Sequence, residues 1–311
     1  MTLLISQFNS SPMIRRVIRL ILILTILCSS PVYAAQIRVA VASNFTTAAK
    51  SLKLEFEKQS EHTVSLSFAS TGKLYAQIKN GAPFDIFLAA DTERPELLER
   101  EGFVAADNRF TYALGQLVLW SSSLEDLDAD TLSKIEFNNL AIANPKLAPY
   151  GLAAEQVLEN LKLREQLQEQ LVFAENVAQA FAFVYTGNAD LGFIAQSQLQ
   201  GEAFSSLDGN VEDEEALSED EKALSEHKEA LSENEEALSE HKEALSEDDS
   251  TSNQADITSG GSFWKVPESY YEPIEQQAIL LSKRSAAAEF LLFLMNDKAR
   301  TIIADAGFKL P

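Results

Sequence analysis

Residues 36–57 read QIRVAVASNFTTAAKSLKLEFE, and two different hydrophobic periods follow one another in this segment. From Gln36 to Ala42, every second residue is a β-branched apolar one, which predicts a β-strand. Beyond Ser43 and Asn44 the apolar residues recur at helical spacing: Phe45, Ala48, Ala49, Leu52 and Phe56. Ser43 and Asn44 are good N-cap residues, so we predict a strand that runs through a cap directly into a helix.

The same alternation continues along most of the chain. We predict further strands at residues 63–68, 84–89, 112–120, 140–143, 171–174, 191–195 and 277–281. Helices are expected from Ser70-Thr71-Gly72 to Asn80-Gly81, from near Tyr150-Gly151, from Val177, and over 286–296. Repeated strand–helix alternation predicts an α/β fold with mainly parallel sheets that helices cover on both faces.

The N-terminal residues predict export. Arg15, Arg16 and Arg19 precede an uncharged apolar run from Leu20 to Cys28, and a small-residue site ends at Ala34. This order is typical of a cleavable signal peptide, and the run is too short for a bilayer core of about 30 Å. The only cysteine lies in this segment, and Leu27 before it is too large for a lipoprotein-processing site. We therefore expect a periplasmic, soluble chain that begins near Ala35, without a disulfide or a lipid anchor.

The chain is strongly acidic. Loss of residues 1–34 removes three arginines and no acidic residue, which leaves 22 basic and 47 acidic residues and a net charge of −25. Such a balance argues against a nucleic-acid partner, because those proteins contact phosphates through many Lys and Arg side chains.

A seven-residue repeat over 214–249 contributes about half of this charge, with 15 acidic and 3 basic residues. Each unit places Ala and Leu side by side, so no broad coiled-coil seam forms. We interpret the repeat as a solvated arm that is inserted in a surface loop between linker-like flanks. An arm that binds a partner or attracts cations is the alternative.

Candidates for catalysis are scarce. The expected mature chain has no cysteine and three histidines, of which two lie in the acidic repeat. His62 is interpreted as an ordinary surface residue, Asp91 as a cap, and Asp85 and Glu61 as carboxylates without an evident catalytic role. No phosphate-binding, nucleophile or zinc motif is present, so we expect neither an enzyme nor a cofactor or bare metal ion.

Four junctions between a strand and a helix carry small hydroxyl, amide or glycine residues. They are Ser43-Asn44, Ser70-Thr71-Gly72, Pro149-Tyr150-Gly151 and Asn176-Val177. A helix N-terminus offers up to four unpaired N–H donors and a partial positive charge, so several of them around one crevice could bind an anion without Lys or Arg. In open α/β sheets that crevice lies beyond the carboxyl ends of the strands. The alternative reading is that these residues are simply helix caps.

Several segments resemble the periplasmic molybdate-binding proteins of ABC transporters. The segments are AVASNFTTAAKSL (40–52), FASTGKLYAQIKNGAPFDIFLAAD (68–91), ANPKLAPYGLAAEQVL (143–158) and ENVAQAFAFVYTGNADLGFIAQSQL (175–199). The C-terminal segments GSFWKVPESYYEPIEQQAILL (261–281) and FLMNDKARTIIADAGFKLP (293–311) are similar to the ending of that family. Only the acidic repeat falls outside the resemblance.

The resemblance implies a two-lobe clamshell. Its expected division is a signal peptide (1–34), the first part of lobe one (35–116), lobe two (117–204), the acidic insert with its linkers (205–261), and a return segment that completes both lobes (262–311). It further implies that molybdate or tungstate binds between the lobes and passes to a permease in the inner membrane, and we expect a monomer. A receptor for another small oxyanion such as sulfate, or less favoured an enzyme on the same fold, remains the alternative.

The resemblance also assigns the anion ligands. They are expected to be Ser43, Asn44, Ser70, Thr71, Tyr150 and Val177. Some family members have a tyrosine after the strand that ends in GFI, whereas this sequence has Ala195 there. The hydroxyl of Tyr150 is the expected replacement.

Overall fold

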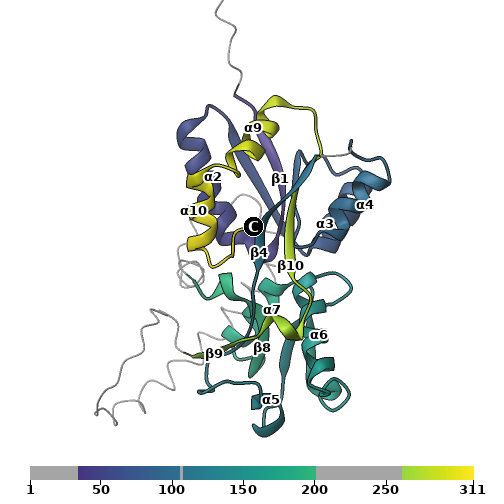
Figure 1. Ribbon diagram of the computed structural model, residues 1–311, viewed down its shortest axis with the longest axis vertical. Helices are drawn as coiled ribbons and strands as arrows, with labels where there is room; N and C mark the ends of the chain where they lie inside the picture. The colour runs from purple at the N-terminus through teal and green to yellow at the C-terminus, as the bar shows by residue number, and fades with distance from the viewer. Residues whose placement is uncertain (1–33, 106–107, 201–260) are drawn as a thin grey trace, which may run out of the picture.

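A computed structural model describes residues 34–105, 108–200 and 261–311, and it contains two five-stranded sheets, each in its own lobe (Figure 1). The first sheet has the order β2-β1-β3-β10-β4. Its strands are β1 Gln36–Ala42, β2 Thr63–Ala69, β3 Ile86–Leu88, β4 Arg109–Gly115 and β10 Ile274–Leu280. The second sheet has the order β7-β6-β8-β5-β9. Its strands are β5 Leu117–Ser121, β6 Leu140–Ala143, β7 Leu171–Ala174, β8 Leu191–Ala195 and β9 Ser262–Lys265.

Helices cover the sheets of both lobes. The first lobe has η1 Ser43–Phe45, α2 Thr46–Gln59, α3 Thr71–Lys79, α4 Glu93–Arg100, α9 Ser285–Phe293 and α10 Asp297–Asp305. The second has α5 Thr131–Lys134, α6 Pro149–Asn160, η2 Gln168–Gln170, α7 Val177–Tyr185, η3 Gln196–Gln198 and η6 Glu268–Tyr270. Among the described residues, no helix is both long and apolar enough to span a membrane.

The alternation of side chains along the strands explains this layering. In β1, Ile37, Val39 and Val41 pack on one face of the sheet in a cluster with side chains of α2, α9 and α10. Ala40 lies on the other face, in a cluster with residues of α3 and α4. Figure 1 shows the two groups of helices on opposite sides of this sheet. Burial on both faces explains why β1 has few polar residues.

The expected α/β fold with two lobes is confirmed, but the sheets are mixed rather than mainly parallel. In the first sheet β1 pairs in parallel with β2 and β3, whereas β10 runs antiparallel to β3 and β4. In the second sheet β6 pairs in parallel with β7 and β8, whereas β5 runs antiparallel to β8 and β9. The chain passes between the lobes twice. Strand β5 follows the first passage and strand β10 follows the second, and these two strands run antiparallel to their neighbours.

The first passage corrects one predicted strand. Residues 112–120 were expected to form a single strand, but β4 ends at Gly115 in the first sheet and β5 begins at Leu117 in the second. The apolar pattern is continuous because both halves are buried, each in a different core. The second passage leads from β9 through η6 into β10. The two passages form the hinge.

Some helices and strands differ from the prediction, and two predicted features lie outside the described residues. The expected helix at 286–296 is α9, which ends earlier, at Phe293; Asn296 then caps the separate helix α10 by accepting a hydrogen bond from the Ala299 N–H (2.8 Å). Helix α4 and strand β9 were not predicted. The signal peptide and the acidic repeat lie outside the described residues.

Candidate functional site

Ser43 and Asn44 follow β1 at its carboxyl end, and both are buried. They are not the N-caps that the sequence predicts, because they form the 3₁₀ turn η1 and α2 begins at Thr46. The adjacent Phe45 is fully buried in the core of the first lobe, and the Thr46 hydroxyl donates to the Ser43 carbonyl (2.8 Å). The tight turn therefore places the phenylalanine in the core and leaves Ser43 and Asn44 at the edge of the sheet.

Ser70 and Thr71 occupy the first turn of α3, directly after β2, as predicted. Both are buried, and the Ser70 hydroxyl has no hydrogen-bond partner among the described residues. The Thr71 hydroxyl oxygen accepts from the Ala90 N–H (3.2 Å), which leaves its proton for another acceptor. A buried hydroxyl without a partner is costly, so this turn is suited to a ligand that accepts hydrogen bonds.

Tyr150 lies in the first turn of α6 in the second lobe, after Pro149, and is buried. Its hydroxyl contacts the Gln276 side chain, and a Cβ atom at position 115 would lie only 2.3 Å from that hydroxyl. Gly115 at the hinge thus makes room for the phenol. Burial and the neighbouring Tyr271 raise the pKa of Tyr150, so the phenol stays protonated at neutral pH and can donate a hydrogen bond.

Val177 is the first residue of α7, as predicted, and Asn176 is its N-cap. The Asn176 carboxamide oxygen accepts from the N–H groups of Ala178 (3.0 Å) and Gln179 (3.1 Å). These two donors are therefore satisfied within the helix. The Val177 N–H has no acceptor in the described part of the chain, so it is the donor that this turn can offer to a ligand.

The structure brings these residues together where the lobes meet. Gln276 accepts from Asn44 Nδ2 (2.9 Å) and donates to the Tyr150 hydroxyl (3.4 Å), so it links the two lobes. Helix α7 packs against η1. The first turn of α3 also reaches the second lobe, because the Gly72 N–H donates to the Leu147 carbonyl (2.8 Å). All four junctions follow the carboxyl end of a strand, where ligands bind in open α/β sheets.

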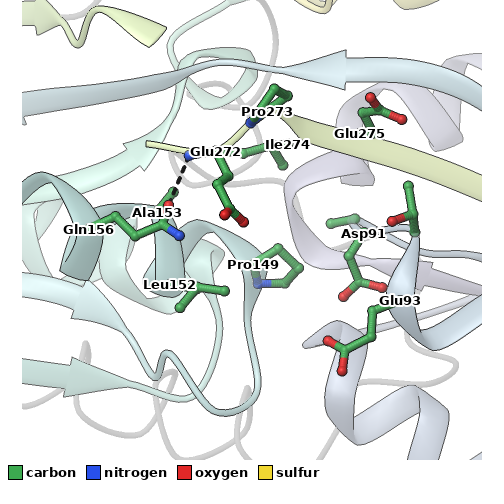
Figure 2. Close-up of a pocket in the computed structure, with 12 residues that line it drawn as sticks. Asp91, Glu93, Pro149, Leu152, Ala153, Gln156, Glu272, Pro273, Ile274 and Glu275 are labelled. Carbon is green, nitrogen blue, oxygen red and sulfur yellow. Dashed lines mark hydrogen bonds between the residues drawn. The ribbon is translucent and has the colours of Figure 1, made fainter. Parts of the chain in front are cut away.

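A groove of about 520 Å³ lies next to this region and has the opposite character (Figure 2). Its lining comes from both lobes and from the hinge, and four of the side chains are acidic: Asp91, Glu93, Glu272 and Glu275. Figure 2 shows the carboxylate of Glu272 on one side of Pro149 and those of Asp91 and Glu93 on the other. Because these carboxylates repel a dianion, the groove is not the expected anion site.

Comparison with known proteins places the chain in a family. The family model described as bacterial extracellular solute-binding protein matches residues 37–309. This chain belongs to that family. The solute-binding protein is 40% identical over 283 residues to the molybdate-binding protein ModA of Azotobacter vinelandii, covering 89% of this chain and 91% of the relative. It is 34% identical over 282 residues to ModA of Rhodobacter capsulatus, covering 89% of this chain and 90% of the relative.

Solved structures agree with this assignment. The structure of the Azotobacter vinelandii periplasmic molybdate-binding protein matches the solute-binding protein with a TM-score of 0.69 and 34% identity, over 88% of this chain and 99% of that one. The sulfate-binding protein SubI of Mycobacterium tuberculosis matches with a TM-score of 0.58 and 12% identity, over 89% of this chain and 87% of that one. The second match shows a shared fold alone.

The other polar candidates of the solute-binding protein have structural contacts. His62 is not an ordinary surface residue, because its side chain is 11% exposed, accepts from the Ala35 N–H (3.3 Å) and pairs with Glu289 (3.3 Å). Asp85 is buried against Arg38 and Arg284. Asp91 accepts from the Arg94 N–H in the first turn of α4 (3.0 Å), although the N-cap residue of that helix is Thr92. Within the residues that the structure describes, no group of three or more His, Cys, Asp or Glu could hold a metal ion.

Sequence reasoning missed three polar residues of the interface between the lobes. Gln276 links Asn44 to Tyr150, as described above. The Ser197 hydroxyl donates to the Asn44 carbonyl (2.9 Å), and the Gln198 side chain donates to the Val177 carbonyl (3.2 Å). The Ala195 N–H also bonds to Gln198 (2.9 Å), so it is not available to a ligand. The available signal was the polar pair Gln276-Gln277, which directly precedes the apolar residues Ala278-Ile279-Leu280 of the same predicted strand region.

Proposed function

We propose that this solute-binding protein captures molybdate or tungstate between its lobes and delivers the anion to an ABC permease in the inner membrane. The two ModA relatives, each matched over about nine-tenths of this chain, support the choice of ligand. The observation that carries the proposal is that uncharged donors of both lobes lie side by side, with Asn44 and Tyr150 joined through Gln276. None of the six proposed ligand residues carries a formal charge.

The chemistry of these residues suits a fully deprotonated oxyanion. Burial of a dianion is costly unless hydrogen bonds satisfy its oxygens, and each charge-assisted bond contributes about 1.5–3 kcal/mol. The N-termini of α3, α6 and α7 add N–H donors and a favourable dipole. Hydrogen phosphate is disfavoured because its own proton needs an acceptor, and sulfate is smaller than molybdate.

We further propose that residues 1–34 are removed on export and that the periplasmic protein acts as a monomer, with lobe boundaries at Gln116 and between Tyr270 and Ile274. It binds the anion as cargo rather than as a cofactor, and it catalyses no reaction.

The deciding experiment is a calorimetric titration of the chain from Ala35 with molybdate and tungstate, followed by competition with sulfate and hydrogen phosphate. We expect dissociation constants of about 1 μM or tighter, equivalent to about −8 kcal/mol. Absence of heat with both metal oxyanions would refute the proposal. Tighter binding of sulfate would instead identify a sulfate receptor.

The site assignment has its own test. Ser43→Ala and Tyr150→Ala should each weaken molybdate binding about tenfold or more, because each removes a charge-assisted bond of about 1.5 kcal/mol or above. Tyr75→Ala is the matched control, since Tyr75 lies on α3 and bonds to Glu101 away from the site (3.1 Å). Unchanged affinity in both site variants would mean that the anion binds elsewhere.

A further inference from the structure

Gln276 is a fully buried glutamine of β10, close to the point where the chain re-enters the first lobe. The pairing of β10 with β4 shifts register between Gln276 and Gln277, which leaves Tyr112 of β4 as the extra residue beside them. A buried amide is costly unless its polar atoms are bonded. A buried amide at this place is therefore expected to have a specific hydrogen-bonding role.

The hydrogen bonds of Gln276 fix its orientation. Its carbonyl oxygen accepts from Asn44 Nδ2 (2.9 Å) and lies 3.1 Å from the Tyr112 hydroxyl, whose single proton can go either to this oxygen or to the Ala89 carbonyl (3.3 Å). The amide nitrogen then faces Tyr150 and donates to the phenol oxygen at 3.4 Å. An amide turned the other way would set its NH₂ group against the NH₂ group of Asn44.

This orientation has a consequence for Tyr150. A phenol oxygen that accepts a hydrogen bond keeps its single proton for a different acceptor. Gly115 approaches the same hydroxyl from the hinge and offers no side chain to accept that proton. The proton is thereby left for an acceptor in the space between the lobes.

We propose that Gln276 is a positioning residue of the anion site, which holds the Tyr150 hydroxyl as a hydrogen-bond donor toward an oxyanion bound between the lobes. This inference rests on the proposed function. It adds that selectivity against protonated oxyanions depends on a residue that does not touch the anion. Because Gln276 also bonds to Asn44 and Tyr112 of the first lobe, the donor becomes oriented as the lobes come together.

The test is a double-mutant cycle on molybdate affinity with Gln276→Met and Tyr150→Phe. Methionine fills a similar volume without hydrogen-bonding, so we expect each single variant to bind about tenfold more weakly. If Gln276 acts through the phenol, the double variant should also lose about tenfold rather than about a hundredfold. A purely structural role would make the two losses multiply, which would overturn the proposal.

A second variant inverts the hydrogen bond. Gln276→Glu keeps an acceptor for Asn44 and Tyr112 but replaces the NH₂ group by an oxygen, to which the Tyr150 hydroxyl would donate. We expect molybdate affinity to fall further than in Gln276→Met, because the carboxylate also repels the dianion. Wild-type affinity in this variant would refute the inference.

The test also includes a measurement of anion selectivity and a control variant at the neighbouring glutamine. The ratio of molybdate to hydrogen phosphate affinity should fall in Gln276→Met, because the phenol is then able to accept the phosphate proton. Gln277→Met changes the next residue, whose amide contacts Arg109 and Thr111 instead, and it should leave both affinities unchanged. If the wild type itself fails to bind molybdate, the proposed function fails; if Tyr150→Phe weakens binding and Gln276→Met does not, only this inference fails.

Discussion

Tyr150 shows how single residues of the hinge and of both lobes depend on one another. Its ring belongs to α6 of the second lobe, its hydroxyl meets a glutamine of β10, and it fits only because residue 115 has no side chain. The sequence identified the tyrosine from its place at a helix N-terminus. It could not identify Gly115 or Gln276, since their roles depend on a close approach between segments far apart in the chain.

Asp85 provides a prediction on stability at the same scale. It is buried and accepts from the Arg38 N–H (2.9 Å) and from Arg284 Nη1 (2.9 Å). Burial alone would raise its pKa, but the hydrogen bonds from Arg38 and the charge of Arg284 outweigh burial and lower it. Asp85→Asn should therefore reduce the free energy of unfolding by about 1–3 kcal/mol at pH 7.

The pH dependence of that loss follows from the sign of the shift. A carboxyl whose pKa is lowered by folding stabilises the protein above its unfolded pKa, and this contribution disappears as the pH falls through the folded pKa. Urea unfolding of Asp85→Asn and the wild type should thus converge in acid. Molybdate affinity at pH 7 is the control and should not change, because Asp85 lies away from the proposed site. A constant difference at every pH would contradict the assignment.

At the scale of elements, the helix N-termini differ in what they leave for a ligand. Asn176 caps α7 and Asn296 caps α10, and each accepts backbone N–H groups of its own helix. Helix α7 packs against η1 at the proposed site, whereas α10 packs against α2. The same residue type therefore has a local role at α10 and, on the proposed function, an additional one at α7.

Asn176→Ala and Asn296→Ala form a matched pair for this reason. Each should reduce the free energy of unfolding by about 1 kcal/mol, the usual cost of losing an N-cap. Only Asn176→Ala should also weaken molybdate binding, by several-fold, because the first turn of α7 then frays and the Val177 N–H loses its orientation. Chemical unfolding and calorimetry on both variants provide the measurement. Equal affinities in the pair would remove Val177 from the site.

Most elements could be predicted from the sequence because their patterns are local. Strand β1, both ends of α3 and the start of α7 follow from hydrophobic period and from cap residues such as Asn176. The 3₁₀ turn at Ser43 was missed because burial of Phe45 overrides the cap preference. The break at Gln116 was missed because two buried strands in different sheets have the same apolar pattern as one long strand.

At the scale of the whole molecule, a largely uncharged interface between the lobes lies within a strongly acidic chain. The lobes meet through uncharged donors and through an ion pair between Lys73 and Glu175 (2.7 Å), whereas the acidic groove lies beside them. The sequence as a whole is far more acidic than this interface, with a net charge of −22. Direct contacts decide affinity at the site, while the distant charges act on the approach of an anion.

The acidic repeat allows this distinction to be tested. Deletion of 214–249 removes 15 acidic and 3 basic residues, and it changes the charge of the chain from Ala35 from −25 to −13. The Debye length is about 30 Å at 0.01 M salt and about 8 Å at 0.15 M, so the deletion should speed molybdate association at low salt and have little effect at physiological salt. Stopped-flow tryptophan fluorescence at both salt concentrations measures the rates. The affinity at 0.15 M salt should stay intact, because none of the proposed ligand residues lies in the repeat; a large loss would mean that the repeat itself contributes to binding.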